Sequence, residues 1–328
     1  MTLPPLGLDI AKSKFNACLV RAGGKLRHKL FPNSAAGFSQ LSGWLSQHGV
    51  TQVHACLEAT GTYGEALAAY LHEQGHTVSL VNPASIKAYA QSRLSRTKTD
   101  RVDAALIAGF CAERRPPAWA PPAPELRQLQ ALVRRLEALH EMRTMEENRL
   151  SSGVTVEAVR ASVEELIAHL TEQIKRTEAL IRSHINQHPG LKRQRELLAS
   201  IPGIGEATAA ALLAEVPDIL QYRSARQVAA FAGLVPRERQ SGRSERGRVR
   251  LSMIGIARLR TALYFPAVTA LRCSPFFQAW AAGLRERGKS KMAVIGAAMR
   301  KLVHLAYGVL KTGRPFDPEW ARKGEKIA

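Results

Sequence analysis

The first 115 residues alternate short apolar runs with turns and amphipathic segments, and this alternation constrains the fold more than any other feature. Short runs rich in β-branched and aromatic residues are typical of strands, whereas apolar residues spaced three and four apart are typical of helices. The predicted strands are LGLDIA, KFNACLV, KLRHKLF, TQVHACLEA and HTVSLVN. Helices are predicted after the third, fourth and fifth strands, which gives the order β-β-β-α-β-α-β-α.

The predicted helices have recognisable ends. Gly49 ends the first helix, AGFSQLSGWLSQHG, and the second is predicted from about Tyr63 to Gln74. Pro83 opens the third helix, and Thr99 is placed to cap the fourth. The order of strands and helices is that of a ribonuclease H-like α/β domain, predicted here over residues 1–115.

Four acids in this acid-poor region stand at positions that suit a metal site. Asp9 and Glu58 each come at the end of a predicted strand, and Asp100 and Asp103 share one face of a predicted helix because they are three residues apart. Magnesium prefers carboxylate oxygens and keeps other coordination sites for water and phosphate. The four acids therefore predict a site for Mg²⁺, or Mn²⁺, that acts on phosphodiesters.

The chain carries a formal net charge of +20, unevenly spread. Residues 1–120 hold 13 Lys and Arg against 7 acids, residues 121–200 hold 12 against 11, and residues 201–328 hold 22 against 9. A strongly basic last third predicts a nucleic-acid partner. An anionic membrane surface is the competing partner, but no basic amphipathic helix with a strongly apolar opposite face is present.

A proline-rich segment, RRPPAWAPPAP, spans residues 114–124 and predicts a semi-rigid linker at 116–124. Residues 125–190 then show two helical seams with balanced charge. They predict an antiparallel helical pair or coiled coil that forms a dimer, and a hairpin within one domain is the alternative. The seam residues are Leu126, Leu129, Val133, Leu136, Leu139 and Met142, then Val156, Val159, Val163, Leu166, Leu170, Ile174 and Ile181.

Residues 191–328 are predicted to form a C-terminal, mainly helical domain. PGIGEATAA resembles the hairpin of a helix-hairpin-helix motif, in which Gly203, Gly205 and the following helix start would hold a phosphate. A plain Gly-rich turn is the alternative. The apolar helix near the C-terminus is predicted to be core.

An arginine-rich segment follows the hairpin. Ser241 lies inside it, and a hydroxyl among guanidinium groups could attack a phosphodiester while the developing charge is stabilised. Ser244 is a competing candidate for the nucleophile, since it lies among the same arginines. The alternative without a catalytic role is that the serine is an ordinary solvent-exposed loop residue. The arginines are Arg237, Arg239, Arg243, Arg246, Arg248 and Arg250.

Other residue patterns argue against further functions. The cysteines Cys18, Cys56, Cys111 and Cys273 form no CxxC pair and predict reduced thiols in a cytoplasmic protein. The ten histidines form no zinc-binding pattern. No signal peptide is visible, and no apolar stretch of about 18 residues predicts a membrane span.

Taken in order, the motifs resemble those of the transposases of the insertion-sequence family numbered one hundred and ten, which includes pilin-gene invertases and bridge-RNA-guided recombinases. The similarity covers about residues 5–317. The motifs that carry it are GLDIAK, CLEATGTYG, VNPASIKAYA, KTDRVDA, IPGIGEATAAALLAEV, FAGLVPRERQSG, RGRVRLS and MRKLVHLAYGVLKTGRPF.

This resemblance implies a RuvC-like domain whose catalytic acids, in the order Asp-Glu-Asp-Asp, fall on Asp9, Glu58, Asp100 and Asp103. It implies that the catalytic serine falls on Ser241 in RQSGR and forms a covalent phosphoserine link with DNA, assisted by the acids and Mg²⁺. Homodimers would assemble into a tetramer with composite active sites, and a structured noncoding RNA would pair with target and donor DNA. The protein would act on bacterial nucleoid DNA.

One departure from the family is visible, because Asn16 stands where many relatives carry an acid. Two other functions remain open. A metal-dependent junction resolvase or nuclease would use only the acids, and a non-catalytic scaffold would only bind RNA. Retention of all four acids argues against the scaffold.

Overall fold

The computed structural model describes residues 3–58, 61–94, 99–153, 155–216, 218–237, 240–241, 245–246 and 250–319, with only the backbone at 62, 240–241 and 245–246. The chain divides into two compact units, Met1–Pro121 and Pro122–Ala328. Each unit has its own hydrophobic core.

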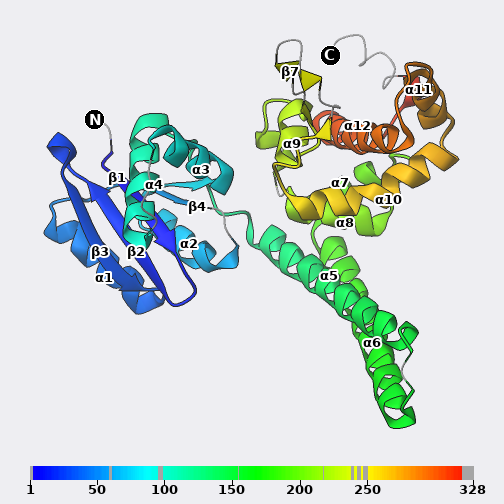
Figure 1. Cartoon of the computed structure of the whole chain (residues 1–328), viewed down its shortest axis with the longest axis horizontal. Helices are drawn as coiled ribbons and strands as arrows, with labels where there is room; N and C mark the ends of the chain where they lie inside the picture. Colours follow the sequence, from blue (N-terminus) through cyan, green and yellow to red (C-terminus); the bar gives the residue numbers. More distant parts are fainter. Residues whose placement is uncertain are drawn as a thin grey trace. The chain divides into compact units, whose positions relative to one another are not determined.

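The first unit is built on a mixed five-stranded sheet with strand order β3-β2-β1-β4-β5 (Figure 1). β1 pairs antiparallel with β2, and β2 with β3, whereas β4 runs parallel to both β1 and β5. The strands are β1 (Pro5–Ile10), β2 (Lys14–Val20), β3 (Leu26–Pro32), β4 (His54–Glu58) and β5 (Thr77–Val81). All five predicted strands are confirmed.

Helices cover both faces of this sheet. One face packs with α1 and α2 in the larger core of the unit, and the other packs against α4 through small residues such as Cys18, Ala104 and Ala108. The helices are α1 (Ala35–Gln47), α2 (Glu65–Glu73), α3 (Pro83–Ser92) and α4 (Asp100–Arg114). The predicted cap at Thr99 is confirmed, because its hydroxyl accepts a hydrogen bond from the Val102 amide. This mixed α/β arrangement is consistent with a ribonuclease H-like domain.

The start of the proline-rich segment is attached to the first unit. The Ser79 hydroxyl lies 3.1 Å from the Pro116 carbonyl oxygen and 2.8 Å from that of Pro117, and the Trp119 amide donates to the Val78 carbonyl at 2.6 Å. The segment is therefore held beside β5 as far as Trp119, which differs from a linker that stands clear over its whole length.

The second unit begins with the antiparallel hairpin of α5 (Pro124–Ser151) and α6 (Glu157–Gln187) (Figure 1). Four residues predicted for its seams are exposed instead. The buried positions of α6 follow steps of four and three from Leu170 to His184, and they include the polar Thr177 and His184. The exposed residues are Met142, Val156, Val159 and Leu166.

The remaining helices pack around α12 in a second core. They are α7 (Pro189–Ala199), α8 (Glu206–Glu215), α9 (Ala225–Phe231), α10 (Ala257–Cys273) and α11 (Pro275–Glu286), and α12 itself spans Lys291–Thr312. By length and composition alone α12 could span a membrane, which differs from the prediction that no apolar stretch is long enough, but 61% of its apolar window is buried. It is the central helix of this core, as predicted for the C-terminal helix.

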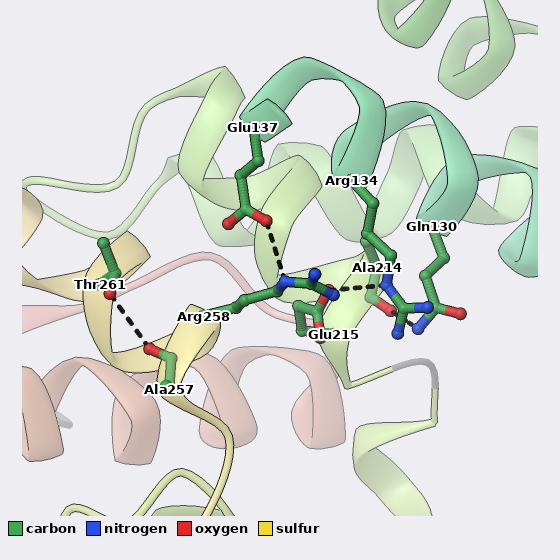
Figure 2. A network of polar contacts seen from close by, with 8 residues as sticks. All are labelled: Gln130, Arg134, Glu137, Ala214, Glu215, Ala257, Arg258 and Thr261. Carbon is green, nitrogen blue, oxygen red and sulfur yellow. Dashed lines mark hydrogen bonds and ion pairs between the residues drawn. The ribbon is translucent and has the colours of Figure 1, made fainter. Parts of the chain in front are cut away.

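Polar contacts fasten the base of the hairpin to this core (Figure 2). The Gln130 side chain donates to the Ala214 carbonyl oxygen at 3.0 Å, and Arg134 pairs with the buried Glu215 at 3.5 Å. Farther along α5, Glu137 pairs with Arg258 of α10 at 3.3 Å. The base of α5 is thus an integral part of the second unit.

Candidate active site

Asp9 and Glu58 lie at the ends of two neighbouring parallel strands. Leu8 of β1 is in register with Leu57 of β4. Asp9 and Glu58 are the next residues of these two strands, so the two acids lie at the same end of the sheet. Both side chains are half-buried. The parallel pairing therefore brings together two acids that are 49 positions apart in the sequence.

α4, whose first turn carries Asp100 and Asp103, packs directly on β1. A Cβ atom added to Gly7 would stand 2.1 Å from the Ala104 carbonyl oxygen and 2.3 Å from the Ala108 amide nitrogen. Only glycine permits such an approach of helix backbone to strand backbone. Gly7 precedes Asp9 by two residues, and Ala104 follows Asp103, so this contact sets how the acid-bearing turn lies over β1.

Further contacts fix the same edge. The Asn33 side-chain amide donates to the Ala11 carbonyl oxygen at 3.1 Å and to that of Tyr63 at 3.0 Å, which ties the end of β1 to the segment after β4. Lys14 at the start of β2 lies 3.6 Å from the Asp100 carboxylate. Both side chains of that pair are exposed, so the pair stabilises little.

The donor chemistry of the four acids fits a hard divalent cation, which takes oxygen ligands. Among the described residues, however, no group of three or more His, Cys, Asp or Glu side chains is gathered closely enough to hold an ion. Burial raises the pKa of Cys18 to about 11, and hydrogen bonding to Cys111 together with burial raises the pKa of Cys56, so neither of these two thiols is a ready thiolate ligand. Cys18, Cys56 and Cys111 are buried free thiols, as predicted, whereas Cys273 is exposed.

The glycines of the predicted phosphate-binding hairpin differ in role. A Cβ on Gly203, whose φ is +90°, would stand 2.4 Å from the Pro266 carbonyl oxygen of α10, so this glycine serves close packing. Gly205 precedes α8 with open space around it and no side-chain cap. Glu206 in the first turn pairs with Arg195 at 3.2 Å. Only Gly205 keeps the exposed position that a phosphate contact requires.

The arginine-rich segment contains two nested pairs of short antiparallel strands. β6 (Pro236–Arg237) pairs with β9 (Arg250–Leu251), and inside it β7 (Gln240–Ser241) pairs with β8 (Glu245–Arg246). Arg237 lies opposite Arg250, and Ser241 lies opposite Glu245. Ser244, Arg239, Arg243 and Arg248 lie outside the described residues.

The base of this ribbon is anchored to the helical core. The side chain of Leu251 packs against Gly296 of α12, where an added Cβ would be 3.1 Å away. Close backbone packing also joins Gly255 to the end of α9, where an added Cβ would be 2.3 Å from the Phe231 carbonyl oxygen. The outer strand pair of the ribbon, β6 with β9, is therefore attached to the helical core.

Comparison with known proteins decides the family. Residues 6–158 match a family described as transposase, and residues 195–281 match the family described as Transposase IS116/IS110/IS902. The chain is 37% identical over 315 residues to the pilin gene-inverting protein of Moraxella bovis, covering 95% of this chain and 97% of the relative. The chain belongs to the IS110 family of transposases.

Other relatives agree with this assignment. The pilin gene-inverting protein of Moraxella lacunata is 36% identical over 95% of this chain, and covers 97% of that relative. The transposase for insertion sequence element IS1111A of Coxiella burnetii is 29% identical over 81% of this chain and 78% of its own length. As a member of the IS110 family, the chain is a DNA transposase or recombinase.

Sequence reasoning missed two residues that position the site of this transposase. Gly7 interrupts a buried strand, and a glycine inside a strand is a signal for close backbone approach. Asn33 gave no signal, since its two carbonyl partners are 22 and 30 residues away in the sequence.

Proposed function

We propose that this transposase cleaves and rejoins DNA through attack of Ser241 on a phosphodiester, assisted by Mg²⁺ or Mn²⁺ held by Asp9, Glu58, Asp100 and Asp103. The observation that carries the proposal is the arrangement of the two strand ends and the helix turn that bear the acids. The register of β1 and β4 places two acids on adjacent strand ends, and the glycine contact at Gly7 lays the turn with the other two over β1. The protein acts on DNA in the bacterial cytoplasm.

Each group has a distinct role in this mechanism. The Ser241 oxygen forms a bond to phosphorus as the bond from phosphorus to the leaving deoxyribose oxygen breaks, which leaves a phosphoserine link to one DNA strand. A bound cation would offset the repulsion among the acids and neutralise phosphate charge. Guanidinium groups stabilise the charge on the transferring phosphoryl group. The arginines proposed for this are Arg237, Arg239, Arg243, Arg246, Arg248 and Arg250.

A denaturing gel for DNA–protein adducts tests the proposal. Wild-type protein incubated with cleavable DNA, Mg²⁺ and the element's RNA should yield DNA that migrates with the protein. Ser241→Ala should abolish this adduct, and Ser244→Ala should retain it. The reverse result moves the nucleophile to Ser244, and adducts that survive both changes rule out covalent catalysis by either serine.

The same gel separates the other functions. A nuclease that uses only the acids would cut DNA and leave free ends in wild-type and Ser241→Ala protein alike. A non-catalytic scaffold would cut nothing, even with Mg²⁺. Asp100→Ala should stop strand cleavage while RNA binding persists, and recombination at the wild-type rate in that variant contradicts the metal assignment.

We also propose that a second copy of the chain packs on the α5–α6 hairpin, in homodimers that assemble into a tetramer. Val159, Leu166 and Leu180 of α6 are exposed at spacings that are multiples of seven, which places them on one side of the helix. Residues 121–200 have a net charge of only +1, which suits a protein partner better than a nucleic acid. Leu166→Glu should lower the oligomeric state in analytical ultracentrifugation, and Glu165→Gln is the control.

Specificity is proposed to come from a structured noncoding RNA that pairs with target and donor DNA. The support is the large positive charge of the last third, net +13, in a chain without a helix-turn-helix sequence signature. Gly205 at the open start of α8 is a candidate phosphate contact, and Gly203 supports its turn. Site-specific strand exchange by RNase-treated protein without RNA would contradict RNA guidance.

A further inference from the structure

The first unit contains an open groove that the proposed chemistry does not use. It lies between the edge strand β3, the end of α3 and the outer side of α4, with a cavity volume of about 360 Å³. Its walls are largely apolar, and they include Leu26, Ala105 and Leu106. Cavities of about 300 Å³ and above are large enough for small-molecule ligands.

Two polar groups at this groove have no hydrogen-bond partner in the part of the chain that the structure describes. Tyr89 is only 6% exposed, and its hydroxyl lies where a Cβ on Gly109 would be 3.0 Å away, so it faces another lining residue of the groove. Neither this hydroxyl nor the Nδ1 atom of His28 makes a hydrogen bond among the described residues. Buried polar groups normally make at least one hydrogen bond. A ligand with matching donors and acceptors would supply the missing hydrogen bonds of both groups.

The charge at the groove is positive but accompanied by neutral polar groups. Arg101 and Arg93 both line it, and Arg93 also contacts Glu113 and lies 5.2 Å from the centre of the Tyr89 ring. Burial, and then the charge of Arg101, lowers the pKa of His28, so its imidazole is neutral near pH 7. A neutral imidazole and a hydroxyl can each donate or accept a hydrogen bond.

We propose that this groove holds one unpaired base of the DNA strand that the transposase acts on, with a neighbouring phosphate on Arg101. A nucleotide combines the required features, which are a flat apolar face, hydrogen-bonding groups at its edge and an anionic phosphate. Arg101 directly follows Asp100, so a strand held here passes the acid-bearing turn of α4. The inference rests on the proposed function, because it treats that turn as part of the catalytic centre.

The test compares two fluorescent ten-nucleotide strands, oligo-dT and the same backbone with abasic sites, bound to the full-length protein in EDTA. Base stacking contributes about 1–3 kcal/mol per base, so wild type should bind oligo-dT at least about fivefold more tightly than the abasic strand. Ala105→Phe fills the groove and should remove most of this preference. Ala112→Phe, on the exposed side of the same helix, should leave the preference unchanged.

Two further substitutions keep the test decisive if Ala105→Phe disturbs folding. Tyr89→Phe removes only the hydroxyl, and it should reduce the preference for oligo-dT severalfold. Arg101→Gln should weaken both strands by the same factor and flatten the salt dependence of binding by about 0.7 in the log–log slope, because one phosphate contact is lost. Arg114→Gln, at the other end of α4, is its control.

An unchanged base preference in Ala105→Phe and Tyr89→Phe overturns the proposal. The proposal is also overturned if these changes remove the base preference for oligo-U RNA and leave that for oligo-dT intact. That result would assign the groove to RNA. Because the assay involves no cleavage, Ser241→Ala should keep the full base preference. Failure of serine catalysis and failure of the groove are therefore distinguishable.

Discussion

The two units hold their candidate catalytic groups in different ways. In the first unit, the acids lie on two sheet strands and one helix, and the helix is fixed by backbone-to-backbone packing at Gly7. In the second unit, Ser241 lies in a strand of only two residues, within a ribbon whose base is anchored by Leu251 and Gly255. The acids are therefore held by the packing of whole elements, whereas the backbone at Ser241 is held by a pair of two-residue strands.

The largest effect is expected for Gly7→Ala, which directly challenges this contrast. The new Cβ would overlap the Ala104 carbonyl oxygen, so α4 must move away from β1 together with Asp100 and Asp103. We expect DNA cleavage to be lost and the free energy of unfolding to fall by about 1–3 kcal/mol. Cleavage gels and urea denaturation measure both quantities.

Gly43→Ala is the matched control, because a Cβ at this position of α1 meets nothing within 4 Å. Alanine also has the higher helix propensity, so we expect unchanged activity and slightly higher stability. Wild-type cleavage in Gly7→Ala would show that the acids do not depend on this contact.

A smaller effect is expected at the base of the hairpin in the second unit. Arg134→Ala removes a charged partner of Glu215, whose side chain is 6% exposed. Loss of its charged partner destabilises a buried carboxylate. We therefore expect the free energy of unfolding, measured by urea denaturation, to fall by about 1–2 kcal/mol. Glu215→Gln in the Arg134→Ala background should recover part of this loss, and no recovery would contradict the pairing.

The core of the second unit should also respond to acid through His304. Burial, followed by the charges of Arg300, Lys301 and Arg226, lowers the pKa of His304 from 6.5 to about 4. On acidification, His304 therefore binds a proton at a higher pH in the unfolded chain than in the folded protein, which favours unfolding. The stability that depends on neutral His304 is complete above about pH 6.5 and is lost as pH falls from 6.5 towards 4.

Thermal denaturation across this window measures the effect. His304→Gln should make the midpoint temperature less sensitive to pH between 6.5 and 4, and His169→Gln, an exposed change on α6, should not. Equal acid sensitivity in wild type and His304→Gln would show that the histidine is not held neutral.

The smallest effect is expected on the surface of the hairpin. Arg176 pairs with Glu172 one turn earlier at 2.9 Å, and both side chains are more than half exposed. Arg176→Ala should lower the free energy of unfolding by about 0.3–0.5 kcal/mol in low salt and by less in high salt. A loss as large as that of Arg134→Ala would mean that this face is covered by a partner.

Local patterns predicted the elements of the first unit well and the seams of the hairpin less well. The strands with Asp9 and Glu58 near their ends, and the cap at Thr99, follow from residues close in sequence. Leu166 and Val159 are apolar at helical spacing and yet exposed, whereas the polar Thr177 and His184 of the same helix are buried. Periodicity shows that a helix has an apolar side, but the partner selects which residues are buried.

The sequence by itself determined the order of strands and helices, the excess positive charge and the candidate acids, because these depend on neighbouring residues and composition. Only the tertiary structure decided that β1 and β4 are adjacent, that Gly7 admits α4, and that Asn33 joins two distant segments. It also created the groove in which Tyr89 and His28 lack partners. Each of these depends on contacts between segments that are far apart in the sequence, and the propensities of neighbouring residues do not determine such contacts.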